Sequence, residues 1–140
     1  MMRRVAVGTD GSATAAEAVK AATDMARSFG AELVLLGVYQ DAGASPASDE
    51  DPELRWASSP SARMREILER TGEEVRRSGI DCRTLTDEGD PGEVLVRLAE
   101  ACQADVLVIG NKGMHRRVLG SVPNTVTHRA TCSVFVVKTT

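Results

Sequence analysis

The amino-acid sequence predicts an α/β fold, a three-layer sandwich in which helices cover both faces of a parallel sheet. Short apolar runs typical of strands alternate along the chain with longer segments whose apolar residues recur at helical spacing. The run AELVLLGVYQ is apolar almost throughout, which indicates a strand buried on both faces, as in a parallel sheet. The length of 140 residues suits one domain with a substantial core.

The first half of the chain contains two strands and a helix. A strand at residues 5–8 leads into the turn Asp10-Gly11-Ser12, where Ser12 is suited to cap a helix. That helix ends at Gly30, a typical C-cap residue, and AELVLLGVYQ follows as the second strand. The predicted buried face of the helix consists of Ala18, Ala22, Met25, Ala26 and Phe29.

A segment without periodicity precedes the next helix. Residues 40–60 are rich in Ala, Ser, Asp and Pro, so we expect a surface loop, with Trp56 packing it against the domain. A helix begins at Ser61 and ends at Gly79, and the weakly alternating run IDCRTLTDEGD predicts a strand near a sheet edge. The expected apolar face of this helix is Met64, Ile67, Leu68 and Val75.

The second half begins with a strong helix start. Asp90-Pro91-Gly92-Glu93 places an N-cap Asp, a first-turn Pro and a Glu at the third helical position. A strand at residues 105–109, a helix from about Ser121 to Ala130 and the strand SVFVVKTT complete the chain. Helices between successive strands favour parallel pairing with right-handed crossovers. The apolar face of the helix after Asp90 is predicted to be Val94, Leu95, Leu98, Ala99 and Cys102.

Composition excludes several classes of function. A net charge of -3 and 3% aromatic residues argue against binding to nucleic acid. No apolar run approaches the ~20 residues of a membrane span, and the N-terminal region lacks the apolar core of a signal peptide, so we expect a cytoplasmic protein without membrane contact. Cys82, Cys102 and Cys132 are odd in number and widely spaced, which favours buried thiols over disulfides or a metal site.

The stretch GNKGMHRRVLGSVPNTV, residues 110–126, points to an anionic ligand. It leaves a buried strand, passes glycines that allow close backbone approach, and enters a helix whose first N–H groups and dipole attract phosphate. Arginines within it suit phosphate, although a solvated basic loop is an equally open interpretation. We predict that this loop holds the phosphates of a nucleotide, although neither G-x-x-x-x-G-K-[ST] nor G-x-G-x-x-G is present.

Two distant stretches should meet at one crevice. Ligands of open α/β sheets bind outside the carboxyl ends of the strands, where the strand order reverses. The turn at residues 8–12 and the loop that begins at Gly110 both leave strands at that end.

Together, GTDGS after the first strand and G-x2-G…GSV before the final VFVVK strand resemble the universal stress protein family, over essentially the whole chain. The resemblance implies a single domain over residues 1–140 with an open five-stranded sheet in the order 3-2-1-4-5, Rossmann-like and adenine nucleotide alpha hydrolase-like. It also implies a homodimer through the last strand, between Val134 and Lys138, which would cover an apolar edge. A charge at Val136 is expected to disrupt this association.

The resemblance further implies an adenine nucleotide, ATP or a relative, with Mg²⁺ arriving with the phosphates. Asp10 would lie beside the adenosine, the backbone of Val38 would meet the adenine, and Gly110 would line the ribose. The phosphates would be surrounded by Gly113, Gly120, Ser121 and Val122. The candidate nucleotide-binding set is completed by Thr9, Ile109, Lys112, His115, Arg116 and Arg117.

One departure from the family pattern leaves the identity of the ligand open. Six residues separate Gly113 from Gly120, three fewer than is usual in the nucleotide-binding members, so AMP, cyclic AMP or an empty site are alternatives to ATP. Purely structural roles are alternatives to ligand binding for two of these residues: Asp10 could be a turn residue, and Ser121 could be a simple N-cap.

We expect a regulatory nucleotide sensor of the stress response, with no assigned catalytic residue. A slow ATPase or self-phosphorylating protein, with Ser121 as acceptor, is one alternative, and a nucleotide-free dimeric interaction module is another. A Ser-His-Asp set could be assembled from Ser121, His115 or His128, and Asp10, but the G-x-S-x-G elbow of such hydrolases is missing.

Overall fold

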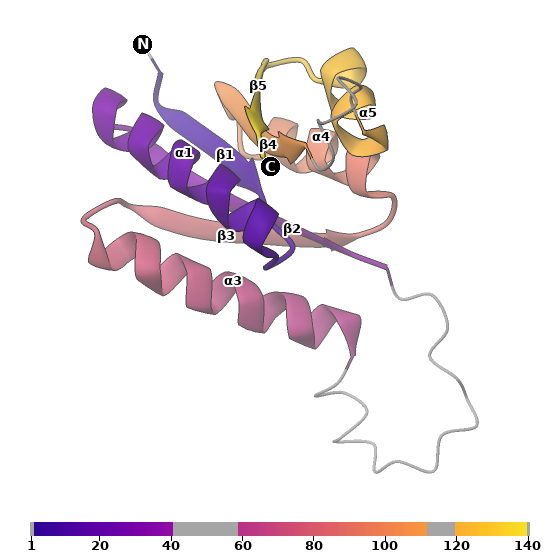
Figure 1. The fold of residues 1–140 in the computed structure, drawn as a ribbon, viewed down its shortest axis with the longest axis horizontal. Helices are drawn as coiled ribbons and strands as arrows, with labels where there is room; N and C mark the ends of the chain where they lie inside the picture. Colours follow the sequence, from indigo (N-terminus) through magenta and orange to yellow (C-terminus); the bar gives the residue numbers. More distant parts are fainter. Residues whose placement is uncertain (1, 41–58, 112–119, 140) are drawn as a thin grey trace.

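The predicted alternation of strands and helices is confirmed. The computed structural model of the protein describes residues 2–40, 59–111 and 120–139 (Figure 1). None of the helices in this part is long and apolar enough to cross a membrane. In chain order the elements are β1 (Arg4–Gly8), α1 (Ala13–Phe29), β2 (Glu32–Tyr39), α3 (Pro60–Arg77), β3 (Cys82–Glu88), α4 (Pro91–Ala101), β4 (Val106–Asn111), α5 (Ser121–Arg129) and β5 (Ser133–Lys138).

The five strands form one sheet in the order β3-β2-β1-β4-β5, and every pairing is parallel. This is the order implied by the family resemblance, and β3 lies at an edge as its weak alternation predicted. At the centre, Val5 of β1 pairs with Leu33 of β2 on one side and with Val106 of β4 on the other. The strand order therefore reverses between β1 and β4.

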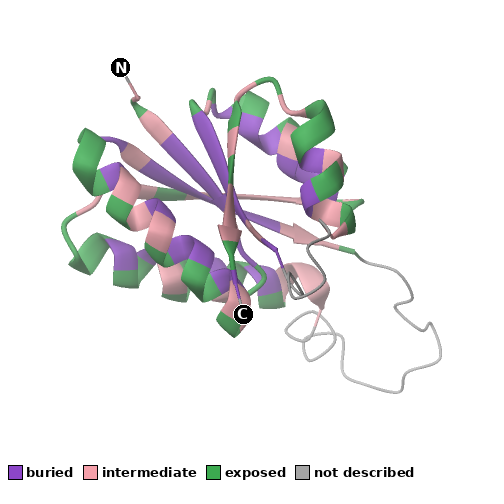
Figure 2. Ribbon diagram, turned by 45° about the horizontal axis from the view of Figure 1, so that its top comes forward, coloured by how far each residue is buried: buried purple, intermediate pink, exposed green. Residues whose placement is uncertain are grey.

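Two helix pairs cover the two faces of the sheet (Figure 1). Because successive side chains of a strand point to opposite faces, Val5 and Val7 pack with residues of α1 and α3, whereas Ala6 packs with residues of α4 and α5. The central strands are buried on both faces, as Figure 2 shows. The continuous apolar runs of the sequence reflect this double burial.

The helix ends largely follow the predicted signals. Ser12 Oγ accepts the N–H of Ala15 at 3.1 Å, and Gly30 has the left-handed φ of 63° that ends α1. Asp90 caps α4 with Pro91 in its first turn. Two predictions were wrong in detail. Helix α3 begins one residue earlier than predicted, because Pro60 occupies its first turn. Phe29 is 52% exposed, because it lies one turn beyond Ala26, the last buried residue of α1.

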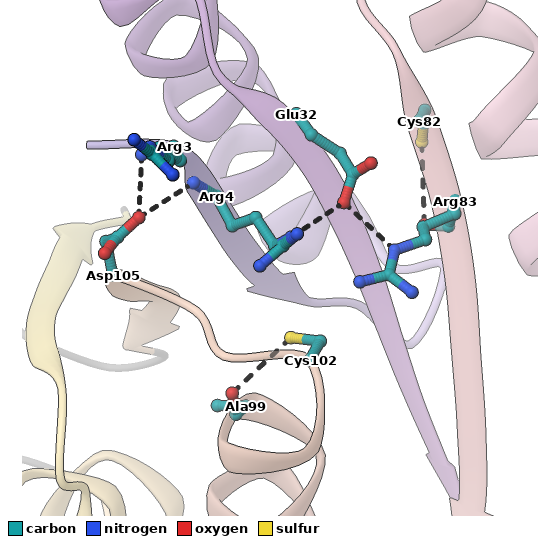
Figure 3. Close-up of polar contacts among 8 residues, drawn as sticks. All are labelled: Arg3, Arg4, Glu32, Cys82, Arg83, Ala99, Cys102 and Asp105. Atoms are coloured by element: carbon teal, nitrogen blue, oxygen red, sulfur yellow. Dashed lines mark hydrogen bonds and ion pairs between the residues drawn. The ribbon is translucent and has the colours of Figure 1, made fainter. Parts of the chain in front are cut away.

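Hydrogen bonds and ion pairs join the amino ends of the strands (Figure 3). Asp105 Oδ2 accepts the backbone N–H groups of Arg3 and Arg4 at 2.7 and 2.9 Å, which ties the start of β1 to the chain before β4. Glu32 Oε1 accepts from Nε of Arg4 and of Arg83 at 3.3 and 3.0 Å, which links β1, β2 and β3. Because these side chains are partly exposed to solvent, each ion pair contributes little to the stability of the fold.

The three cysteines are free thiols, as expected, but only one is fully buried. Cys102 is buried, whereas Cys82 and Cys132 are half-buried. Burial raises the pKa of each thiol. All three are therefore protonated at neutral pH and poor nucleophiles.

The Asp105 contacts predict a specific dependence of stability on pH. The N–H groups of Arg3 and Arg4 lower the pKa of this carboxyl group below its ordinary 3.8. A lowered folded-state pKa adds stability that is complete above the ordinary pKa and is lost as the pH falls through the folded-state value. Asp105→Asn should therefore lower the unfolding temperature at pH 7, and this effect should shrink as the pH falls through the folded-state pKa of Asp105.

Thermal unfolding followed by circular dichroism at several pH values measures this difference. Glu17→Gln, on the exposed face of α1, serves as the control. An equal loss of stability from Asp105→Asn at every pH would contradict the assignment to the carboxylate.

Candidate functional site

A crevice lies at the carboxyl ends of β1 and β4, where the strand order reverses. Its volume is about 380 Å³, within the range of small-molecule sites. The turn after β1 and the start of α5 both line it, so two stretches more than 100 residues apart share one hollow, as the sequence predicted. The lining residues are Gly8, Thr9, Asp10, Ser12, Thr14, Ala15, Leu36, Val38, Pro91, Leu95, Ile109, Gly110, Asn111, Gly120, Ser121, Val122 and Pro123.

The structure brings together every candidate binding residue that it describes. Those that line the crevice are Thr9, Asp10, Val38, Ile109, Gly110, Gly120, Ser121 and Val122. The remaining candidates lie outside the described residues; they are Lys112, Gly113, His115, Arg116 and Arg117.

The turn between β1 and α1 is fixed by hydrogen bonds within it and by one to β2. The N–H of Thr9 donates to the carbonyl of Leu36 at 3.0 Å, and its Oγ1 accepts the N–H of Gly11 at 3.2 Å. Asp10 Oδ1 accepts the N–H of Ser12 at 2.9 Å. Asp10 therefore has the turn role that the sequence left open, while its exposed side chain also lines the crevice.

Helix α5 starts without a capping side chain. Gly120 is its N-cap residue, so the alternative that Ser121 acts as a simple N-cap is wrong. Pro123 in the first turn has no N–H, so the amides available at the helix start are those of Ser121 and Val122, which line the crevice. The other three helices in the described residues have side-chain caps, which are Ser12, Ser59 and Asp90.

Part of the crevice lining is apolar. Leu36 and Ile109 come from the sheet, and Leu95 comes from α4. Among the lining residues that the structure describes, Asp10 has the one ionisable side chain. The crevice thus offers both apolar contacts and helix-start amides, a combination suited to a ligand with a flat apolar group and an anionic group.

Part of this site was not predicted from the sequence. The fourth strand was expected to end at Ile109, whereas β4 continues to Asn111, whose side chain is fully buried beside the crevice. Asn-Lys-Gly resembles loop sequence, so nothing local identified this residue. Thr14, Pro91 and Leu95 could have been found from topology, because helices α1 and α4 also begin at the carboxyl end of the sheet.

The residues of a hydrolytic triad do not assemble in the described part. His128 lies seven residues after Ser121 on the same helix, about 10 Å along its axis, with Nδ1 2.7 Å from the carbonyl of Asn124. The other candidate base, His115, lies outside the described residues. Nor do the described residues contain a cluster of three or more His, Cys, Asp or Glu side chains able to hold a metal ion.

Known proteins resemble the chain over its length. A model of the universal stress protein family matches residues 1–138. A universal stress protein of Mycobacterium tuberculosis is 34% identical, in an alignment covering 99% of this chain and 97% of the relative. A solved universal stress protein in complex with cAMP is 31% identical, with a TM-score of 0.74 and 99% coverage of both chains.

A more distant solved structure shares the fold. It is an Arabidopsis thaliana protein of the same family with AMP bound, 23% identical, with a TM-score of 0.78 and coverage of 99% of this chain and 92% of that one.

Proposed function

The chain belongs to the universal stress protein family, and we propose that it binds an adenine nucleotide in the crevice between β1 and β4. The observation that carries this proposal is the pairing, in one crevice of about 380 Å³, of an apolar wall with the uncapped start of α5. The relative in complex with cAMP, at 31% identity over nearly the whole chain, supports the same ligand class.

The apolar side chains and the helix-start amides would bind different parts of the nucleotide. The adenine would pack against the apolar side chains, while the backbone of Val38 would offer hydrogen bonds to its edge. A phosphate would accept hydrogen bonds from the N–H groups of Ser121 and Val122, where the helix dipole favours negative charge. AMP and cyclic AMP each have one phosphate group, so this one phosphate position would be enough for either.

ATP is the third candidate. Its further phosphates would extend toward Gly113 and the basic residues His115, Arg116 and Arg117 of the glycine loop, as the sequence predicts. Mg²⁺ would arrive with those phosphates. We further propose that the protein acts in the cytoplasm as a regulatory sensor of the stress response.

Calorimetric titration tests the proposal directly. AMP, cyclic AMP, ATP and adenosine are titrated separately into the protein, with GMP as the base-specificity control. Binding of any adenine nucleotide supports the proposal. Absence of heat with all of them would contradict it and would favour the nucleotide-free interaction module.

Labelled ATP separates a sensor from an enzyme. Intact nucleotide bound to the protein supports the sensor, whereas released phosphate supports a slow ATPase. Labelled protein would indicate self-phosphorylation, and Ser121→Ala would then test Ser121 as the acceptor.

A negative charge at the start of α5 should weaken the binding of ligands that carry a phosphate. Ser121 is exposed in the first turn, where an acidic residue stabilises a helix, so Ser121→Glu should fold normally. Its carboxylate would repel the phosphate, and we expect the affinity for AMP to fall about ten-fold, equivalent to about 1.4 kcal/mol. Adenosine binding should not change.

Ser121→Gln, which has a similar size and no charge, is the matched control and should lose less affinity for AMP. Calorimetry and thermal unfolding are measured on all three proteins. Equal AMP affinity in the wild type and Ser121→Glu would exclude a phosphate at this helix start.

We also propose that the protein forms a homodimer through β5. This strand is at the sheet edge, and Phe135 on it is 46% exposed. Val136, where the sequence suggested a test by charge, is half-buried and packs against the core on the α4 and α5 face. A charge at Val136 would therefore threaten folding as well as association.

Phe135→Lys is the cleaner variant. We expect it to convert a dimer to a monomer of 14.9 kDa by light scattering, with an unchanged circular dichroism spectrum. Phe29→Lys is the matched control, since Phe29 is similarly exposed but is the last residue of α1 and not part of β5. A wild-type monomer, or an unchanged mass in Phe135→Lys, would refute pairing through this face.

A further inference from the structure

Asn111 is a fully buried polar side chain at the edge of the crevice. It is the last residue of β4, and its exposure is 0%. Burying an amide is costly unless it forms hydrogen bonds. Asn111 Oδ1 accepts the N–H of Gly120 at 2.9 Å, and its backbone carbonyl accepts Oγ1–H of the buried Thr139 at 2.8 Å. The side chain thus joins the end of β4 to the start of α5.

This bond replaces a local cap that α5 cannot make. In a capping box, the N-cap side chain bonds the third residue of the helix, whose Glu or Gln bonds the N-cap N–H in return. In α5 the N-cap is Gly120, which has no side chain, and the third residue is Pro123, which offers neither group. Asn111 supplies the acceptor for the N-cap N–H from another element.

Gly120 and Asn111 also fit each other sterically. Gly120 has a φ of -65°, which any residue can adopt, so backbone conformation does not require glycine. A Cβ atom at this position would lie 3.3 Å from Asn111 Oδ1, a tight contact. A larger residue would press on the amide that holds the helix start.

We propose that Asn111 is a positioning residue for the phosphate of the ligand. This role rests on the nucleotide binding proposed above, and Asn111 would act through Gly120. By fixing the N–H of Gly120, Asn111 sets the direction of the next two peptide planes. These planes carry the N–H groups of Ser121 and Val122, which line the crevice. Donors held in place before binding cost less to order around an anion.

The test compares ligands with and without phosphate. Asn111→Leu has a similar size but no acceptor, and we expect its affinity for AMP to fall about ten-fold while its affinity for adenosine stays within about two-fold. The amide hydrogen of Gly120 should also exchange faster by NMR. If Asn111 only stabilised the fold, its replacement would lower the affinities for AMP and adenosine equally.

Two further variants keep the test decisive. Thr139→Val removes the hydrogen bond to the backbone carbonyl of Asn111 and leaves the Gly120 bond intact, so it should cost stability without changing the ratio of AMP to adenosine affinity. Asn111→Ser stays polar but has a shorter side chain that does not reach Gly120, and it replaces Asn111→Leu if that variant fails to fold.

The outcomes distinguish this inference from the nucleotide proposal. If the wild type binds AMP and the AMP-to-adenosine ratio is unchanged without the Asn111 amide, or falls equally in Thr139→Val, the positioning role is overturned. If the wild type binds neither ligand, the nucleotide proposal fails. Hydrogen exchange at the Gly120 amide then decides by itself whether Asn111 holds the start of α5. Faster exchange without the Asn111 amide then supports its hold on the helix start, and unchanged exchange overturns it.

Discussion

The parallel pairing of β1 with β4 is the constraint on which the rest of the molecule depends. Because β1 pairs with β2 on its other side, the chain winds outward in one direction through β2 and β3 and in the other through β4 and β5. Right-handed crossovers then send α1 and α3 to one face and α4 and α5 to the other. Between β1 and β4 the chain leaves the sheet toward opposite faces, and the crevice opens there.

The properties of this crevice come from how its two rims are stabilised. The turn after β1 is held by hydrogen bonds of Thr9 and Asp10, including one from Thr9 to β2, which makes it a fixed wall. The start of α5 has no capping side chain, and its N-cap N–H is bonded by Asn111 from β4. The next amides therefore remain on the crevice side. The same region thus combines a rigid frame with donors that an anion can use.

Sequence reasoning succeeded where a local pattern has one structural solution. Alternation of strand and helix periods gave the fold class, and Ser12, Gly30 and Asp90 marked helix ends because capping involves neighbours in the chain. It failed where the deciding contact is distant. Phe29 fits the helical pattern but lies beyond the packed part of α1, and the role of Asn111 depends on Gly120 on another element.

The sequence by itself determined the elements, their order, the parallel pairing they favour and the two motifs that belong to the crevice. Each of these follows from side-chain periodicity, glycine conformation or capping within a few residues. Only the tertiary structure decided that apolar side chains of the sheet and of α4 line the hollow that the motifs share, and that a buried amide holds the start of α5. Those features are contacts between segments far apart in the chain, and their distances arise only when the sheet and both helix layers have packed.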